Sequence, residues 1–183
     1  MESDRILDAA GGLFAEEGVA RVGMGEIARA AGCSRATLYR YFDNREALLT
    51  SYVHREARKV GAELATLIDG IDDPRERLLS GVTHALRLVR DSPALAAWFA
   101  ATSVGVQAAD SSDVVRAMTA AFLVSLDRGK TTAPAGGGTD RQARWLVRVL
   151  TSLLVSPGRD ADDERAMLEE FVVPVLLTAT TTR

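Results

Sequence analysis

The sequence predicts an all-α protein, and three observations favour this fold class. Alanine, leucine, valine and arginine are abundant while aromatic residues make up only 5% of the chain, which favours helices over a β-sandwich. Apolar residues recur at helical spacing in several segments, and no segment shows the apolar–polar alternation of a strand. Serine, aspartate, glycine and proline stand where helices would begin and end. Together these signals predict about nine helices in the 183 residues.

The first helix is expected from about Ser3 to Glu17, and Gly18 ends it. Gly11 and Gly12 interrupt this helix and should cost about 1 kcal/mol each relative to alanine. Two glycines at this point would allow close packing against a neighbouring segment. The apolar stripe of the helix is formed by Ile6, Leu7, Ala10, Leu13 and Phe14.

A short helix, a glycine turn and a second short helix are predicted between residues 26 and 42. Gly32 supplies the positive-φ position at which the chain leaves the first of these helices. Ser34 follows as the N-cap of the second. A turn of this length between two short helices is the helix-turn-helix arrangement, whose second helix enters the major groove of DNA. The small apolar face of the first helix is formed by Ile27, Ala28 and Ala31.

A fourth, long helix is expected to begin at Asp43 or Asn44 and to continue to about Leu67. Asp43 and Glu46 have the spacing of a capping box. A helix of this length would connect an N-terminal DNA-binding head to the rest of the molecule.

The next two helices are marked by capping residues followed by proline. Asp73 is the predicted N-cap of a fifth helix that starts at Pro74 and ends at about Arg90. Ser92 caps a short, apolar sixth helix over residues 93–99 in the same way.

A seventh helix is expected to end near Arg128 and to begin at Ser111, Ser112 or Asp113. Residues 129–139 follow it and are rich in threonine, alanine, proline and glycine. This composition predicts a flexible surface loop.

The last two helices carry broad apolar stripes at positions i, i+1, i+4, i+5, i+8 and i+9, counted from Trp145 in the eighth and from Met167 in the ninth. Pro174 interrupts the ninth helix and should bend it. The two helices either form a domain of their own or pair with the same helices of a second copy in a four-helix interface. The residues predicted for that interface are Trp145, Val149, Leu150, Leu153, Leu168, Phe171, Val172 and Val175.

Charge is distributed unevenly along the chain, although the net charge is only −3. Residues 1–20 carry a net charge of −4, whereas residues 21–45 carry a net charge of +3. The positive charge is therefore concentrated on the helix-turn-helix, where phosphate contacts would be made.

Enzymatic, secreted and membrane classes find little support in the sequence. The single cysteine, Cys33, cannot form an internal disulfide, which suits a reducing cytoplasm. The acidic N-terminus is unlike a signal peptide, and no segment reaches the roughly 18 apolar residues of a membrane helix. The sequence contains no phosphate loop, dinucleotide fingerprint or Gly-x-Ser-x-Gly motif, and its two histidines and one cysteine have no zinc-site spacing. We therefore expect no catalytic residue, metal or cofactor.

About 50 residues at the N-terminus resemble the DNA-binding domain of the TetR (tetracycline-repressor-like) family of bacterial transcription regulators. The matching segments are Ile6-Leu-Asp-Ala-Ala, Leu13-Phe14-Ala15-x-x-Gly18, Ile27-Ala28-x-x-Ala31-Gly32-x-Ser34, Thr37-Leu38-Tyr39-x-Tyr41-Phe42 and Arg45-Glu46-Ala47-Leu48. The resemblance implies a three-helix DNA-binding head at residues 1–45. It also implies that residues 46–183 form a helical domain that binds a small effector and dimerises through its last two helices. Gly23 and Gly25 stand where the family usually has a threonine and a polar or basic residue.

The predicted DNA-binding residues lie on and beside the second helix of the motif. Arg35, near its N-terminus, pairs bidentately with guanine in our first interpretation, and contacts phosphate or only solvent in the alternatives. Thr37 offers its hydroxyl to phosphate or its methyl group to thymine, while Tyr39 and Tyr41 can donate to phosphate. The resemblance implies a phosphate contact at Tyr39. Arg45 is either a phosphate clamp or a charge on a solvated helix face. The full predicted set is Ser34, Arg35, Ala36, Thr37, Tyr39, Tyr41 and Arg45.

A second set of residues is a candidate for binding an effector in the C-terminal domain. Its apolar members either line a cavity or are ordinary core residues, and its polar members would recognise the ligand. The set is Trp98, Phe99, Met118 and Phe122, with His84 or Gln107 as the polar group.

These observations predict a homodimeric, cytoplasmic transcription regulator, expected to be a repressor, that binds a palindromic operator and is released by a small, largely apolar effector. A structural dimer that coats DNA without effector control is the alternative, and it requires a filled C-terminal core. A helical enzyme with an accessory DNA-binding head would need a polar cluster in the C-terminal half, and none is visible in the sequence.

Overall fold

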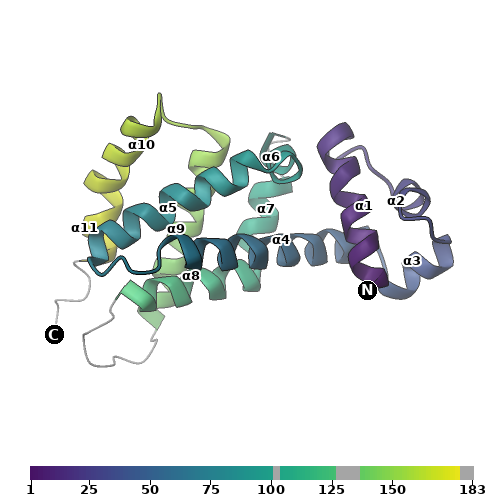
Figure 1. Cartoon of the computed structure of the whole chain (residues 1–183), viewed down its shortest axis with the longest axis horizontal. Helices are drawn as coiled ribbons and strands as arrows, with labels where there is room; N and C mark the ends of the chain where they lie inside the picture. The colour runs from purple at the N-terminus through teal and green to yellow at the C-terminus, as the bar shows by residue number, and fades with distance from the viewer. Residues whose placement is uncertain (101–103, 127–136, 178–183) are drawn as a thin grey trace.

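The computed structural model describes residues 1–100, 104–126 and 137–177, and these residues form helices and no strand. Three helices form a head at one end of the molecule, and the others form a bundle at the opposite end (Figure 1). The head contains α1 (Glu2–Glu17), α2 (Met24–Ala30) and α3 (Arg35–Tyr41). The other helices are α4 (Arg45–Leu67), α5 (Pro74–Asp91), α6 (Pro93–Ala100), α7 (Val104–Ser111), α8 (Asp113–Leu126), α9 (Gly137–Val155), α10 (Ala161–Met167) and α11 (Val173–Leu177), with the π-helical turn η1 (Leu168–Val172) between the last two.

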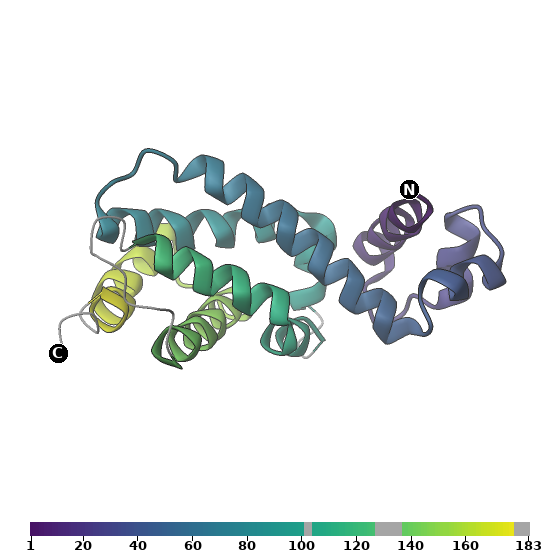
Figure 2. The same ribbon diagram turned by 90° about the horizontal axis from the view of Figure 1, so that it is seen from below.

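Helix α4 connects the head to the bundle, as the sequence predicts. It leaves the head beside α3 and runs the length of the bundle (Figure 2), where it packs against α5 and α8. Helix α9 packs against α8 on the other side of the bundle. The all-α fold class and the order of head and bundle are therefore confirmed.

The caps predicted for the head are present. The hydroxyl of Ser34 accepts a hydrogen bond of 3.0 Å from the backbone N–H of Thr37, which fixes the start of α3. Gly18 and Gly32 have φ values of 82° and 62°, a region that favours glycine. The N–H of Gly23 donates to the Glu26 carboxylate at 2.8 Å, so a glycine serves as the N-cap of α2.

The hydrophobic core of the head does not end at residue 45, where the head was expected to end. Leu48 and Tyr52 on α4 and Trp98 on α6 are buried together with the apolar faces of α1, α2 and α3. The first two turns of α4 therefore belong to the core of the head as well as to the connection.

Three helix starts lie where the capping pattern predicts them, and at one of them the structure decides between two candidate caps. The carboxylate of Asp73 accepts from the N–H of Glu76 at 2.8 Å, and Ser112 caps α8. At the start of α4 the cap is Asn44, whose side chain accepts from the N–H of Ala47 at 2.8 Å, and not Asp43. The two residues are adjacent and are both good N-caps, so the sequence pattern left this choice open.

Helix α7 was not predicted, because residues 104–111 include a glycine and two β-branched valines and carry no clear apolar stripe. Its position depends on tertiary packing. A Cβ atom on Gly105 would lie 2.7 Å from the carbonyl oxygen of Trp98, so only glycine permits this approach of α7 to α6. Most of the predicted loop at 129–139, and Arg128 before it, lie outside the described residues, and Gly137 already belongs to α9.

Pro174 lies inside the last helical segment without ending it. The chain widens to a π-helical turn at Leu168–Val172 directly before this proline, and the N–H of Val173 bonds to the carbonyl of Leu168. Proline provides no N–H for the helix and its ring crowds the preceding turn, so a local change of helix type here has a physical cause.

An ion pair fastens the C-terminal segment to the bundle. The guanidinium of Arg90 on α5 donates two hydrogen bonds of 2.7 and 2.9 Å to the carboxylate of Glu164 on α10, and a third of 2.8 Å to the carbonyl of Leu153 on α9. The N–H of Gly158 donates to the same carboxylate at 3.0 Å. The hydrogen bonds from Arg90 hold the pKa of Glu164 below its ordinary value.

The two glycines of α1 have different surroundings, which gives a matched pair of variants. A Cβ atom on Gly11 would lie 3.0 Å from the Tyr52 hydroxyl oxygen, whereas a Cβ atom on Gly12 would meet nothing within 4 Å. We expect Gly12→Ala to raise the free energy of unfolding by up to about 1 kcal/mol, because alanine is the better helix former. We expect Gly11→Ala to give no gain or to destabilise, because the Tyr52 ring must move.

Urea denaturation of both variants measures this difference. An equal stabilisation by the two substitutions would show that the contact between α1 and Tyr52 does not limit packing in the head.

Candidate nucleic-acid interface and internal cavity

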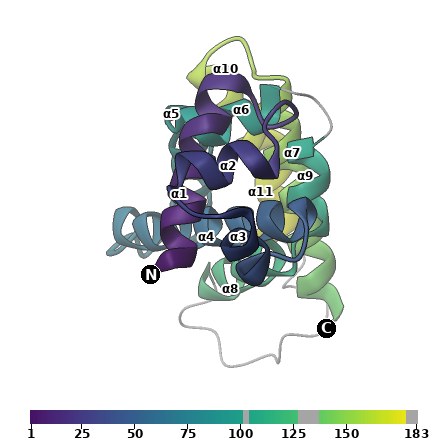
Figure 3. The ribbon, with the colours of Figure 1, turned by 90° about the vertical axis from the view of Figure 1, so that its right-hand side faces the viewer.

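The outer surface of α3 carries the polar side chains that the sequence placed there. Arg35, Ala36, Tyr39 and Tyr41 are exposed and Thr37 is half-buried, while Leu38 points inward and is fully buried. Viewed from the end of the molecule, α2 and α3 lie in front with the bundle behind them (Figure 3). A duplex can therefore approach α3 without meeting the bundle.

Arg35 rests against α2 in a way that depends on the glycine at position 25. A Cβ atom on Gly25 would lie 2.5 Å from Nη2 of Arg35, so any larger residue would push the guanidinium away from α2. The sequence showed Gly25 as a departure from the family pattern but did not show that Arg35 lies on it.

Arg40 is an exposed cation on α3 that the predicted set does not contain. Its guanidinium carbon lies 5.3 Å from the centre of the Tyr41 ring, which is cation–π geometry. Its position within α3, beside two tyrosines, is the signal that would have added it to the set. The guanidinium of Arg40 and the ring of Tyr41 therefore lie together on the outer surface of α3.

Arg45 has partners inside the protein that the sequence did not predict. Its Nε atom donates to the carbonyl of Val22 at 3.1 Å, and its Nη2 atom donates to the carbonyl of Val19. Arg45 thereby ties the start of α4 to the loop between α1 and α2. These hydrogen bonds position the head, and the expected role of Arg45 as a phosphate clamp stays a prediction.

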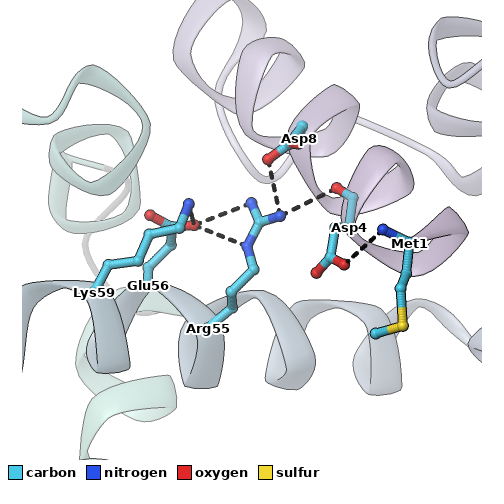
Figure 4. Close-up of polar contacts among 6 residues, drawn as sticks. All are labelled: Met1, Asp4, Asp8, Arg55, Glu56 and Lys59. Carbon is cyan, nitrogen blue, oxygen red and sulfur yellow. Dashed lines mark hydrogen bonds and ion pairs between the residues drawn. The ribbon is translucent and has the colours of Figure 1, made fainter.

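Two groups of contacts connect the head to the bundle, and the first is polar. Arg55 on α4 reaches α1, where it donates to the carbonyl of Asp4 at 3.1 Å and pairs with the carboxylate of Asp8 at 2.8 Å (Figure 4). Glu56 accepts from Arg55 at 3.0 Å and from Lys59 at 2.9 Å. These contacts hold α1 of the head against α4 at the point where α4 leaves the core of the head.

The second connection is a group of three aromatic rings from α1, α4 and α6. Tyr52 and Trp98 stack with ring centres 5.7 Å apart, and the Phe14 ring meets both edge-on. Burial, together with the nearby carboxylate of Glu56, raises the pKa of Tyr52 to about 12, so its hydroxyl stays neutral at physiological pH. Through the contacts of Trp98 with Phe14 and Tyr52, helix α6 packs against the core of the head.

The bundle contains a cavity of about 470 Å³ that is partly open to solvent. Helices α4, α5, α6, α7, α8 and α9 all contribute to its wall, which is mostly apolar. This volume and composition are those of a small-molecule site rather than of a filled core.

The four apolar residues predicted for an effector site all line this cavity: Trp98, Phe99, Met118 and Phe122. The two polar residues predicted with them do not. His84 is not among the cavity-lining residues of α5, and its Nδ1 lies 2.8 Å from the carbonyl oxygen of Ser80, while Gln107 is exposed on α7. The sequence predicted no helix at Gln107, and on α5 its pattern did not separate His84 from the residues that line the cavity, so the expectation for these two residues is corrected.

Two glycines give the cavity its shape. A Cβ atom on Gly61 of α4 would lie 2.0 Å from the methyl carbon of Met118, and one on Gly81 of α5 would lie 2.4 Å from Cζ of Phe122. The two α8 side chains, four residues apart, therefore enter notches that the glycines leave open. Sequence reasoning missed both glycines.

The eight residues predicted for a dimer interface divide into two groups. Phe171 and Val175 are 59% and 50% exposed, large fractions for apolar side chains, and Trp145 and Val149 are half-buried. The expectation is corrected for the rest: Leu150 lines the cavity, and Leu153, Leu168 and Val172 lie in the core of the bundle. The apolar stripe predicted on these helices is wide enough to cover two faces of each helix. One face packs into the core of the bundle, and the other is left partly or fully exposed.

Within the described parts of the chain, no three histidine, cysteine, aspartate or glutamate residues lie together as a metal site requires. No helix in these parts is both long enough and apolar enough to cross a membrane.

Comparisons with known proteins agree with the geometry of the head. Residues 6–52 match the family model described as bacterial regulatory proteins, tetR family. An HTH-type transcriptional regulator of Mycobacterium tuberculosis is 55% identical over 181 residues, which cover 98% of this chain and 87% of that protein.

Solved structures match over the whole chain. The transcriptional repressor QsdR of R. erythropolis, from the TetR family, is 26% identical with a TM-score of 0.69, and the match covers 100% of this chain and 96% of that one. FadR of Thermus thermophilus, a TetR-family repressor solved in complex with lauroyl-CoA, is 23% identical with a TM-score of 0.66, and the match covers 99% and 96%.

Proposed function

Because this chain belongs to the TetR family of bacterial regulatory proteins, we propose that it is a ligand-responsive repressor that binds a palindromic operator as a homodimer. The observation that carries the proposal is the outer surface of α3, where Arg35, Tyr39, Arg40 and Tyr41 are exposed on a helix held by the Ser34 cap. Side chains near the start of such a helix reach base edges, and the others reach phosphates. Binding to DNA would place its action in the bacterial cytoplasm.

The dimer would form through α9 and the segment from α10 to α11. Phe171 and Val175 expose apolar surface there, and Trp145 and Val149 lie partly open. Two copies of this surface related by a two-fold axis would cover it in a four-helix interface. The two α3 helices must then lie about 34 Å apart to enter successive major grooves on one side of the duplex.

The cavity would hold the effector, and two routes would carry its influence to the head. Helix α4 lines the cavity and is fastened to α1 through Arg55, and α6 lines it and enters the head core through Trp98. An effector that binds better when these helices are displaced would favour a head spacing that does not fit the operator.

The alternative, a structural dimer without effector control, requires a filled C-terminal core. The 470 Å³ cavity supports the first function over this alternative. The enzyme alternative needs a cluster of catalytic side chains, and in the described residues the polar side-chain groups of the cavity lining are three hydroxyls, one arginine and the indole N–H of Trp98.

Selection of bound sites from random DNA tests the proposal. We expect a palindrome with two half-sites one helical turn apart, two protomers per duplex by analytical ultracentrifugation, and affinity that falls steeply with salt. The logarithm of the binding constant should fall by about 0.9 per unit of log salt for each phosphate neutralised. Equal enrichment of unrelated sequences would contradict the proposal and favour the structural dimer.

A further inference from the structure

The polar groups in the cavity wall differ in whether their hydrogen bonds are already made. Thr119, Ser125 and Thr151 donate to backbone carbonyls of their own helices at 2.8, 2.7 and 3.0 Å. Their donor hydrogens are therefore not available to a ligand. These three hydroxyls therefore need no hydrogen-bond acceptor from a ligand in the cavity.

Arg77 on α5 is the exception. Its residue is only 6% exposed, it lines the cavity, and its Nε atom is buried without a hydrogen-bond partner. In the described parts of the chain no carboxylate forms an ion pair with it. Arginine stays protonated in proteins, and a buried charge without an opposite charge is costly.

The hydrogen bonds that Arg77 does make fix the direction of its guanidinium. Its Nη1 atom donates to the carbonyls of Ile68 and Ile71 at 2.9 and 3.1 Å, at the C-terminal end of α4. Because the guanidinium is planar, the edge formed by Nε and Nη2 points away from these carbonyls. Two nearly parallel N–H groups on one edge match the two oxygens of a carboxylate.

The lining of the cavity extends along two helices, and Arg77 lies near one end of it. The wall follows α4 from Val53 to Ile68 and α5 from Arg77 to Val89, a distance on the order of 20 Å at 1.5 Å per residue. Arg77 lies where α4 passes to α5, remote from the head, whereas Trp98 lies at the end nearer the head (Figure 1). The indole N–H of Trp98 is also buried without a partner, but it is neutral and does not require an anion.

We propose that the effector is a long-chain carboxylate whose head group binds the Nε–Nη2 edge of Arg77 and whose apolar chain extends between α4 and α5 toward Trp98. The proposal rests on the proposed role of this cavity as the effector site. The carboxylate would supply the missing acceptors and the missing negative charge together, and the apolar wall would cover the chain.

Isothermal titration with dodecanoate and dodecan-1-ol, which share one chain length, tests the proposal. For the unaltered protein we expect dodecanoate to bind on the order of 10- to 100-fold more tightly than the alcohol, because a hydrogen bond to a charged group is stronger than a neutral one. Arg77→Gln should remove this preference while changing the affinity for the alcohol little. Arg87→Gln is the matched control, since Arg87 is exposed on the same helix and does not line the cavity.

Arg77 also caps α4, so circular dichroism must show that the glutamine variant folds. If it does not fold, the ratio of the two affinities in the unaltered protein decides the question. Equal binding of the acid and the alcohol would overturn the proposal. So would tighter binding of lauroyl-CoA, which has the same chain without a free carboxylate.

Operator affinity, measured separately by fluorescence anisotropy, distinguishes this proposal from the proposed function. If dodecanoate binds through Arg77 and leaves operator affinity unchanged, the ligand assignment stands and effector control fails. If dodecanoate does not bind while another ligand releases the operator, effector control stands and the ligand assignment fails.

Discussion

Replacement of Arg35 by alanine is expected to weaken binding to the selected operator by roughly 2–6 kcal/mol per dimer, because a bidentate arginine–guanine contact contributes about 1–3 kcal/mol and the dimer has two copies. Arg35 is the first residue of α3 and is exposed, and its guanidinium lies beside Gly25 in the free protein. Loss of a base contact should also relax the preference for guanine at one position of each half-site. Fluorescence anisotropy on the operator and on single-base variants, at fixed salt, measures both effects.

Arg87→Ala controls for the loss of positive charge, because Arg87 is exposed on α5, outside the head. We expect this variant to retain the operator preference and nearly all of the affinity. If Arg35→Ala weakened binding to all sequences equally and lowered the salt dependence, Arg35 would contact the DNA backbone and not a base.

Glu164→Gln is expected to lower the free energy of unfolding by about 1–2 kcal/mol at pH 7, because it removes the carboxylate partner of Arg90, whose side chain is 35% exposed and partly screened by solvent. The pKa of Glu164 is lowered in the folded protein, so its stabilising contribution is complete above the ordinary value of 4.5 and is lost as pH falls through the lower, folded value. The difference between variant and parent should therefore shrink below about pH 4.5. Urea denaturation between pH 3 and pH 7 measures it.

The neighbouring pair supplies the control for that experiment. Asp163 also pairs with an arginine, Arg159, but the arginine is 86% exposed and the pair joins two residues near the start of α10. We expect Asp163→Asn to have a much smaller effect, because solvent screens an exposed pair. A loss as large as that of Glu164→Gln would show that the start of α10, and not its link to α5, determines the stability of this region.

Local signals in the sequence predicted the head and most helix starts. The Ser34 cap, the positive φ of Gly32 and the exposure of Arg35 depend on residues within a few positions of one another, so spacing alone was sufficient. Helix α7 has no such signal, because its place depends on Gly105 meeting the backbone of Trp98. The internal hydrogen bonds of Arg45, which was interpreted as a phosphate clamp or a solvated charge, were missed because its acceptors lie more than twenty positions earlier in the chain.

The bundle was harder to predict than the head, since the residues that line its cavity depend on which face of each helix turns inward. Apolar periodicity left open whether Trp98 and Phe122 line a cavity or belong to an ordinary core, and the structure places both in the cavity wall. Periodicity was not enough to exclude His84, which lies two helical turns after Arg77 on the same face of α5 and yet does not line the cavity. The predicted dimer interface needed correction at some residues for the same reason. Leu168 and Phe171 are separated by less than one helical turn, yet Leu168 is buried and Phe171 is exposed.

Trp98 belongs both to the core of the head and to the wall of the cavity, and this has an evolutionary consequence. A change at this position that admits a new ligand also repacks Phe14 and Tyr52, so its effects are pleiotropic. Under the proposed function, ligand preference can diverge at Met118 or Phe122 without repacking the head, because neither residue belongs to its core. Divergence at Trp98 would require compensating substitutions in the head.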